Sequence, residues 1–333
     1  MNQTSDDNAN LPLVSVVMPV RNEADFIAHS LGAVLAQDYP AGRLEILVVD
    51  DGSTDGTPEA IAALPGAARA RVLRGQGGLI ASALNTAVRR SRGAVIVRVD
   101  GHTVIAPDYV RRCVEQLQAT GADNVGGLMR PVGLTPMGRA IAAAMSSPFG
   151  LPARFHYDER AQDADTVYMG AWRRDVFERV GLFNEQLAIN EDYELNYRIR
   201  KAGGRVFLAP DVRSAYYGRQ TLSSLWQQHF RYGAWKARMI RLHPRSIRPR
   251  HLAAPLLVLA VVVLAVGGLF DGRGWAALGV VLVLYGLATL LASLRTAARR
   301  GWDLLPRLPP AFVTLHLAWG SGFWRGLLRP PRP

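Results

Sequence analysis

The sequence predicts an α/β fold built on a parallel sheet, followed by an α-helical membrane region. Three apolar runs, at 13–19, 44–49 and 94–99, are each rich in valine, isoleucine and leucine and end abruptly in polar residues. Continuous apolar runs of this kind are typical of parallel strands that are buried on both faces. Nearer the C-terminus, two stretches of about 20 residues carry no charge, which is the length that a membrane-spanning helix requires.

The polar residues that follow the three runs predict a ligand site. Asp50, Asp51 and Asp55 follow the second run, while Arg21 to Glu23 and Asp100 to His102 follow the other two. One Asp-Gly pair after a strand is more often only a turn. In open α/β sheets, however, ligands bind beyond the carboxyl ends of the strands. Because three strands end in this way, we expect one crevice lined by Asp, Asn, Arg and His side chains.

The charge balance is strongly basic, with 39 Lys and Arg against 27 Asp and Glu and a formal net charge of +12 in 333 residues. Such an excess is compatible with nucleic acid, an anionic substrate or a membrane surface. Many of the basic residues flank the two uncharged stretches, where they would meet anionic lipid headgroups. No zinc-ligand spacing or RNA-binding motif is present, so we expect no nucleic-acid partner.

Two further features concern the compartment and the single cysteine. Cys113 stands in a helical pattern and is expected to be a small core residue rather than a nucleophile. The segment 1–10 is a polar tail without the apolar stretch of a signal peptide, so we expect the N-terminal part to stay in the cytoplasm.

The uncharged stretches at 252–270 and 275–294 predict a transmembrane hairpin, with buried core helices as the alternative. Basic residues lie on both outer sides, in a juxtamembrane segment at 236–251 and again after 294. The positive-inside rule then places both hairpin ends in the cytoplasm and predicts a multi-pass protein of the bacterial inner membrane. The apolar segment 308–328 is either a third span or an interfacial helix, and the charges that follow it favour the second reading.

Between the strands and the membrane region, several helices are expected. Glycines 75, 77 and 78 precede a run of small residues at 79–87, but the first strand is not followed by the glycine fingerprint of a dinucleotide-binding fold. A short helix is predicted at 137–147 and a loop at 148–165. A helix is also predicted at 190–199, and acidic residues in a first helical turn, here Glu191 and Asp192, are by themselves usually structural.

Taken in order, these motifs resemble those of family 2 glycosyltransferases, which have the GT-A fold, a Rossmann-like fold that binds nucleotide sugars. The matching segments are 50–53, 100–102, 190–192 and 228–232. More closely, the chain resembles bacterial membrane enzymes of succinoglycan-type exopolysaccharide assembly, through segments 98–103, 147–150, 216–219 and 230–235. The resemblance implies a GT-A domain at 11–235, with the membrane region at 252–333.

The resemblance also implies a donor site for a UDP-sugar. Asp51 would accept a hydrogen bond from the uracil imide, and Asp100 with His102 would face the metal that binds the diphosphate. An imidazole ligand suits Mn²⁺ better than Mg²⁺, although His102 could also serve only as a hydrogen-bonding loop residue. The residues implied to bind the nucleotide sugar are Pro19, Arg21, Glu23, Asp50, Asp51, Asp100, Gln228, Arg231 and Trp235.

Asp192 is the expected catalytic base, because a sugar hydroxyl needs a proton acceptor as it attacks the anomeric carbon. One direct displacement inverts the configuration, and Glu191 would support the helix start or contact the acceptor. A cytoplasmic site beside the membrane implies a polyprenyl-diphosphate-linked saccharide as the acceptor. Two alternatives stay open: a transferase that loads a sugar onto polyprenyl phosphate, and a noncatalytic membrane scaffold.

Overall fold

The computed structural model describes residues 11–151 and 153–331, so the expected polar tail at 1–10 lies outside the described residues. It forms two compact units. The first contains the chain up to Arg130 together with Tyr157–Tyr216, and the second contains 131–156 and the chain from Tyr217 onward. These units do not follow the expected boundary at 235, since the segment 217–235 belongs to the second unit; the functional domain boundaries stay a prediction.

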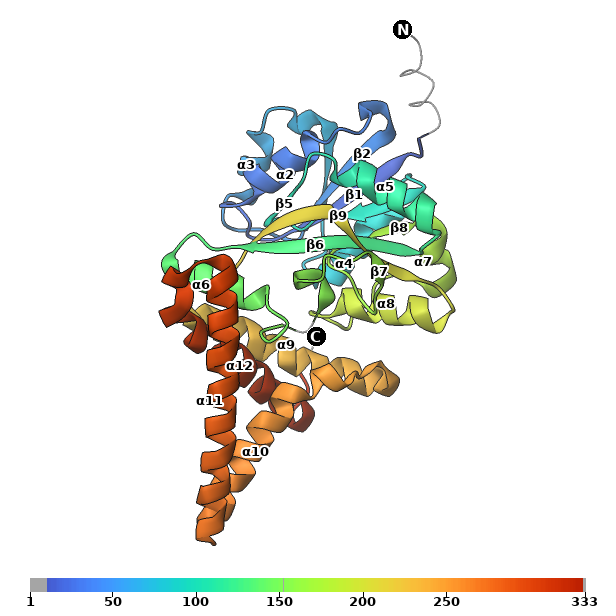
Figure 1. The fold of residues 1–333 in the computed structure, drawn as a ribbon. Helices are drawn as coiled ribbons and strands as arrows, with labels where there is room; N and C mark the ends of the chain where they lie inside the picture. Colours follow the sequence, from blue (N-terminus) through green and yellow to red (C-terminus); the bar gives the residue numbers. More distant parts are fainter. Residues whose placement is uncertain (1–10, 152, 332–333) are drawn as a thin grey trace. The chain divides into compact units, whose positions relative to one another are not determined.

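The first unit contains the expected parallel sheet, in which neighbouring strands follow the order β3-β2-β1-β4. Strands β1 and β2 of this sheet are labelled in Figure 1. Its parallel strands are β1 (Val14–Val20), β2 (Leu44–Asp50), β3 (Ala70–Arg74) and β4 (Val95–Arg98). Val14 on β1 pairs with Leu44 on one side and with Val95 on the other, so the carboxyl ends of the three expected strands lie at one edge of the sheet. The prediction of parallel neighbours is therefore confirmed.

The sheet continues through antiparallel strands, which makes it mixed rather than purely parallel. The antiparallel strands are β5 (Thr103–Ile105), β6 (Asn124–Val132), β7 (Gln162–Asp163), β8 (Ala171–Arg173) and β9 (Val206–Tyr217). The helices of this unit are α2 (Ile27–Leu35), α3 (Thr57–Ala62), α4 (Ile80–Arg90), α5 (Tyr109–Thr120), α7 (Arg174–Val180) and α8 (Glu191–Lys201). The predicted helices that begin near residues 79 and 190 are thus confirmed as α4 and α8.

The core of the first unit is formed by the apolar strands and the helices that cover them. Val16, Val48 and Val97, from three adjacent strands, have no exposed surface. Cys113 on α5 lies in the same core, and burial raises the pKa of its thiol. A thiol that stays protonated is a poor nucleophile, which agrees with the predicted core role.

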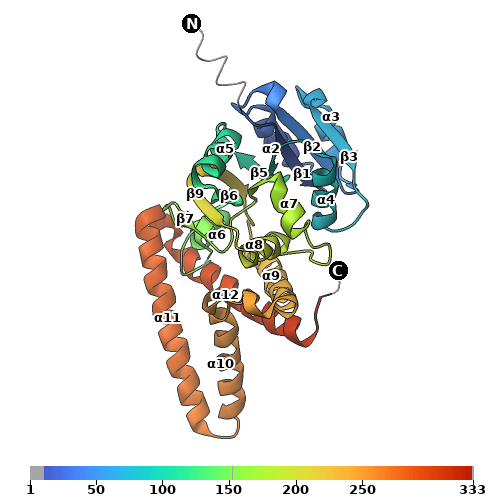
Figure 2. The ribbon, with the colours of Figure 1, turned by 90° about the vertical axis from the view of Figure 1, so that its right-hand side faces the viewer.

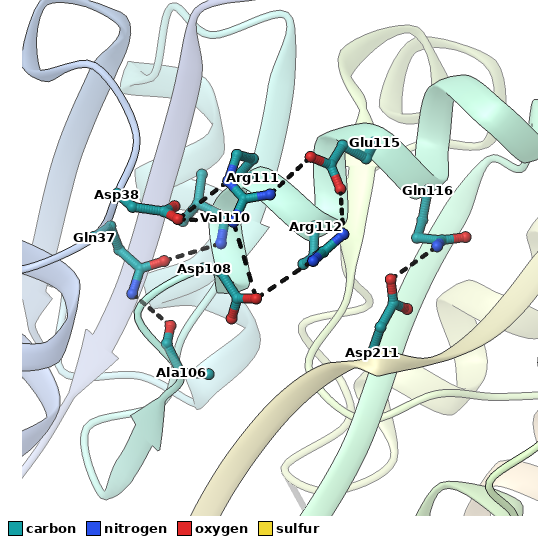
Figure 3. Close-up of polar contacts among 10 residues, drawn as sticks. All are labelled: Gln37, Asp38, Ala106, Asp108, Val110, Arg111, Arg112, Glu115, Gln116 and Asp211. Atoms are coloured by element: carbon teal, nitrogen blue, oxygen red, sulfur yellow. Dashed lines mark hydrogen bonds and ion pairs between the residues drawn. The ribbon is translucent and has the colours of Figure 1, made fainter.

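Polar contacts anchor α5 at its first turn (Figure 3). Gln37 donates to the carbonyl of Ala106 at 2.7 Å and accepts from the backbone N–H of Val110 at 2.9 Å. Arg111 on the same helix forms an ion pair with Asp38 at 2.8 Å. These contacts join α5 to the chain after α2 and so hold the segment that follows β5.

The second unit is helical. Its helices are α6 (Pro136–Met145), α9 (Leu222–Leu242), α10 (Ala253–Gly268), α11 (Gly272–Arg300) and α12 (Leu308–Leu328), with short 3₁₀ turns at η3 (Arg154–His156), η4 (Pro244–Ser246), η5 (Pro249–His251) and η6 (Trp302–Arg307). A side chain at Gly322 or Gly326 of α12 would collide with the carbonyl oxygens of Phe230 or Ala234 on α9. Glycine at these positions therefore allows the two helix backbones to pack in direct contact.

Helices α10 and α11 lie side by side (Figure 2). Both carry exposed apolar side chains. Val263 on α10 is 56% exposed and Leu284 on α11 is 61% exposed. Among the described residues, α11 is the one helix both long and apolar enough to cross a membrane, by length and composition. With 16 residues, α10 is about 24 Å long at 1.5 Å per residue, short of a hydrocarbon core of about 30 Å.

The expectation of two spans is therefore corrected: within the described residues one helix, α11, has both the length and the composition of a span, and a multi-pass topology is not supported. The physical reason is local: α10 ends at Gly268 and the chain turns into α11 at Gly272, so α10 has too few residues for a full span. The segment 308–328 forms α12, whose apolar Phe312 and Leu315 are buried within the second unit.

Candidate active site

Asp51 lies directly beyond the carboxyl end of β2, where its side chain is almost fully buried. Its backbone N–H donates to the carbonyl of Val20 on β1 at 2.9 Å. Its Oδ1 accepts hydrogen bonds from the backbone N–H groups of Gly77 at 2.9 Å and Gly78 at 3.3 Å. A side chain at Gly75 would collide with this carboxylate. The glycine segment before α4 thus provides the space and the donors that orient Asp51.

The neighbouring carboxylates Asp50 and Asp55 make turn contacts instead. Asp50 Oδ1 accepts from the Ser53 backbone N–H at 3.1 Å and from its hydroxyl at 2.5 Å. Asp55 accepts from the Thr57 hydroxyl at 2.6 Å, which lowers the pKa of Asp55, and from the Ala24 N–H at 3.1 Å. For these two residues the turn interpretation accounts for the side chain, and the nucleotide-binding role of Asp50 stays a prediction.

Glu23 and His102 form a pair between the loops that follow β1 and β4. His102 Nδ1 and Glu23 Oε1 are 2.8 Å apart. A side chain at Gly101 would approach Glu23 Cγ to 2.8 Å, so glycine permits this contact. The other side chains predicted from the β1 end differ in position: Pro19 is buried within the strand, whereas Arg21 is exposed.

Arg98, the last residue of β4, joins the strand end to helix α8. Its Nε and Nη2 donate to the two carboxylate oxygens of Asp100, at 2.6 and 3.3 Å, and its Nη1 donates to Glu191 Oε1 at 2.8 Å. The three side chains are buried, with exposed fractions of 6% for Arg98, 11% for Asp100 and 7% for Glu191. Burial alone would lower the pKa of Arg98, but the carboxylates outweigh it and raise that pKa well above its ordinary value.

Helix α8 begins after Asn190, whose φ of 71° lies in the left-handed region. Glu191 is buried, and its burial raises its pKa to about 7, although Arg98 acts in the opposite direction. Asp192 is partly exposed, and its Oδ1 accepts from the Tyr193 backbone N–H at 2.6 Å. The buried Glu191 is thus held by Arg98, whereas Asp192 is the acidic side chain of this turn that reaches solvent. Their catalytic roles stay predictions.

Whether the strand end fits a divalent cation depends on the side chains it offers. Among the described residues, no group of three or more His, Cys, Asp or Glu side chains is arranged as a metal site. Asp100 and His102 supply one carboxylate and one imidazole from the same turn. A carboxylate oxygen that accepts one hydrogen bond retains a further lone pair. Mg²⁺ sites at nucleotides commonly use one or two carboxylates, with phosphates and water as the other ligands. The Asp100 carboxylate, with the softer imidazole of His102 beside it, therefore fits a divalent cation bound together with a diphosphate.

The remaining predicted residues lie on α9, which belongs to the second unit. Gln228 is buried and donates to the Tyr232 hydroxyl at 3.1 Å. Trp235 is buried, with the guanidinium of Arg238 5.6 Å from its ring centroid. Arg231 is exposed. Their part in nucleotide binding stays a prediction.

Comparison with known proteins decides the family. Residues 15–181 match the model of glycosyl transferase family 2. The succinoglycan biosynthesis protein ExoA of Rhizobium meliloti is 32% identical over 317 residues, which cover 94% of each chain. The chain belongs to glycosyl transferase family 2. The predicted family is therefore confirmed, and the protein is a glycosyltransferase.

Two further relatives extend this comparison. A dolichyl N-acetyl-alpha-D-glucosaminyl phosphate 3-beta-D-2,3-diacetamido-2,3-dideoxy-beta-D-glucuronosyltransferase of Methanococcus voltae is 23% identical over 95% of this chain and 97% of its own. The structure of a mannosyltransferase from Pyrobaculum calidifontis, in complex with GDP-Man and Mn²⁺, superimposes with a TM-score of 0.60 at 24% identity, covering 92% of this chain and 87% of that one. This structural likeness supports the predicted Rossmann-like GT-A fold.

Sequence reasoning gave Arg98 no role of its own. A signal was available, because Arg98 stands in an otherwise apolar buried strand, 95–99. A buried arginine requires paired carboxylates. What the sequence could not supply was the identity of its partner Glu191, which is 93 residues away along the chain.

Proposed function

We propose that this glycosyltransferase is an inverting enzyme of bacterial cell-surface polysaccharide assembly, which transfers a sugar from a UDP-sugar to a polyprenyl-diphosphate-linked saccharide. The observation that carries the proposal is the bond from Arg98 to both Asp100 and Glu191. It joins the strand end expected to hold the donor diphosphate to the helical turn that carries the expected base. The hydrogen bonds of Arg98 therefore connect the residue expected to bind the donor to the helical turn expected to act on the acceptor.

Donor binding is supported by the setting of Asp51. Its buried carboxylate already accepts hydrogen bonds from two backbone N–H groups. In the same way it would accept a hydrogen bond from the imide N–H of uracil. Guanine also presents N–H donors, and the Pyrobaculum calidifontis mannosyltransferase was studied with GDP-Man. The donor test therefore includes both kinds of base.

The proposed reaction is one displacement at the anomeric carbon. The partly exposed Asp192 accepts the proton of the attacking hydroxyl, a contribution of roughly 10²–10⁴ in rate for general-base catalysis. Buried Glu191 holds the start of α8 through Arg98. A divalent cation, Mn²⁺ or Mg²⁺, held by Asp100 and His102 would offset the charge of the departing nucleoside diphosphate.

A lipid-linked acceptor at the cytoplasmic face of the inner membrane is supported by the second unit. Helix α11 has the length and composition of a span and exposes apolar side chains such as Val283 and Leu284. Arg245, Arg248 and Arg250 precede α10, and such cations favour anionic lipid. The name of the Methanococcus voltae relative describes a sugar added to a lipid-linked sugar.

The test is to incubate membranes that contain the protein with radiolabelled UDP-sugars and GDP-mannose, one at a time, with Mn²⁺ or Mg²⁺. The expected product is a labelled lipid whose glycan is longer than one sugar after mild acid release, formed by the wild type and not by Asp192→Asn. A labelled monosaccharyl lipid would replace the proposal with transfer to polyprenyl phosphate. No labelled product with any donor, together with no UDP or GDP binding in calorimetry, would favour a noncatalytic scaffold.

A further inference from the structure

The guanidinium of Arg98 uses each of its three nitrogens on a carboxylate. Two nitrogens hold both oxygens of Asp100, and the third holds Glu191. A guanidinium that binds a carboxylate through two parallel N–H bonds orients it as well as neutralising it. Asp100 is thus held in one orientation by Arg98, two positions before it in the chain and at the end of β4.

We propose that Arg98 is a built-in counter-cation of the donor site, which competes with the divalent cation for Asp100 and positions the first turn of α8 through Glu191. The inference rests on the proposed function and extends it. It makes Arg98 a positioning residue, because its nitrogens bond to protein carboxylates and not to the reacting groups. Two consequences follow, one for cation binding and one for the helix.

The consequence for cation binding comes from the local charges. Arg98 contributes one positive charge, and the carboxyl groups of Asp100, Glu191 and Asp192 act on it electrostatically. The guanidinium donates one hydrogen bond to each oxygen of Asp100 and adds a positive charge beside the place where a metal would bind. Removing it frees Asp100 and makes the site more negative, so a cation should bind more tightly when nucleotide is absent.

The consequence for the helix comes from the bond to Glu191. This bond links α8 to β4 across 93 residues of sequence. Without it, the first turn loses its tie to the sheet, and the Glu194 N–H bond to the Asn190 carbonyl, 2.9 Å long, should open more often. The same substitution should therefore tighten cation binding and loosen the turn that carries Asp192, a combination that general destabilisation does not produce.

The test uses the purified full-length protein in detergent and titrates it with Mn²⁺, followed by electron paramagnetic resonance without nucleotide and then with UDP. Relative to wild type, Arg98→Met should lower the Mn²⁺ dissociation constant without nucleotide by about tenfold, the scale of one nearby charge at a screened protein site. Hydrogen exchange at the amides of residues 193–194 should become at least about tenfold faster, because these amides open by local unfolding.

A second variant, Arg98→Lys, separates charge from geometry and serves if the methionine variant does not fold. The lysine keeps the positive charge but lacks the fork that reaches two carboxylates. Its Mn²⁺ affinity should stay within about threefold of wild type, as the retained charge requires, while exchange at 193–194 should still accelerate.

Arg173→Met is the matched control. Arg173 forms an ion pair with the buried Asp123 at 3.1 Å and pairs with Val95, at the opposite end of β4 from Arg98. This control should change neither Mn²⁺ affinity nor exchange at 193–194. If the wild type binds Mn²⁺ and Arg98→Met binds it equally or more weakly, the inference is overturned while the proposed function stands. If the wild type binds no Mn²⁺ or Mg²⁺ even with UDP, the metal part of the proposed function falls, and the competition falls with it.

Discussion

The two units bury polar side chains in opposite ways. In the first unit, several buried carboxylates are paired with arginine, among them Asp100 and Glu191 with Arg98, and Asp123 with Arg173. In the second unit, the buried histidines include His156 at 6% exposure and His229 at 1%. Burial lowers the pKa of each to about 3, so both are neutral near pH 7. Paired charges suit a site for charged ligands, whereas neutral rings suit helix packing.

The histidines also show what an unpaired polar group implies. Within the described residues, neither ring nitrogen of His229 has a hydrogen-bond partner. Protonation would place a charge in this setting, close to the positive charge of Arg219, which further lowers the pKa of His229. We therefore expect substitution of carboxylates to have its main effects in the first unit, and a fall in pH to destabilise mainly the second unit.

The largest expected effect is on turnover and lies in the first unit. Asp192→Asn keeps the size of the side chain and a partner for the exposed amides of the first turn, but it removes the proton acceptor. We expect turnover to fall by about 10²-fold or more, with UDP and Mn²⁺ binding retained, as measured by radiolabelled transfer and calorimetry. Glu191→Gln should cost less. A folded Asp192→Asn protein with near-normal turnover would show that Asp192 is not the catalytic base, and Glu191 and Glu194 would then be the candidates.

The next effect tests the second unit with acid. Because the folded-state pKa of His229 lies below its ordinary value of 6.5, the unfolded chain binds a proton that the folded unit does not. Stability should therefore be complete above about pH 6.5 and decrease as the pH falls toward 3, by about 2 kcal/mol for this residue at pH 5. Chemical unfolding at pH 7.5 and pH 5 measures this difference.

His229→Gln should remove about this much of the pH dependence. The matched control is His29→Gln, since His29 is exposed on α2 of the first unit. If the free energy of unfolding depends on pH equally in the wild type and in His229→Gln, His229 is not the group that causes acid destabilisation. The contrast drawn between the two units would then be wrong.

A smaller effect is expected at Asp51. Asp51→Asn should weaken UDP binding by about 10- to 150-fold, because it removes a charge-assisted hydrogen bond worth about 1.5–3 kcal/mol. Asp50→Asn is the internal comparison and should cost less, since Asp50 already bonds to Ser53. Calorimetry with UDP and Mn²⁺ measures both. If Asp50→Asn had the larger effect, the roles of the two carboxylates would be exchanged.

The smallest effect concerns the exposed apolar face of the second unit. Leu284→Ser on α11 should change the free energy of unfolding in detergent by no more than about 0.5 kcal/mol, as is usual for exposed positions. The side chain is 61% exposed, so little packing is lost. A loss above about 1.5 kcal/mol in detergent would mean that Leu284 packs against another protein surface, such as a second copy of the chain.

Local composition was sufficient for much of the first unit. The runs of valine, isoleucine and leucine predicted β1, β2 and β4 within one or two residues, because a strand buried on both faces needs an uninterrupted apolar run. The glycines after residue 74 and the acidic turn after Asn190 likewise predicted the starts of α4 and α8. Strands β6 and β9 were not predicted: β6 contains Gly126 and Gly127, and β9 contains Pro210 and Asp211, residues that are rare in strands.

By itself, then, the sequence determined which residues form the strand ends, where the acidic turn stands, and that Cys113 belongs to a core, since each depends on neighbours a few positions away. The tertiary structure alone decided which carboxylates are paired. Asp50 closes its own turn, Asp51 faces the glycine amides, Glu23 contacts His102, and Arg98 connects Asp100 to Glu191. These contacts join residues up to 93 positions apart. The pairing of a buried charge depends on which strand and helix ends the fold brings together, which no local pattern encodes.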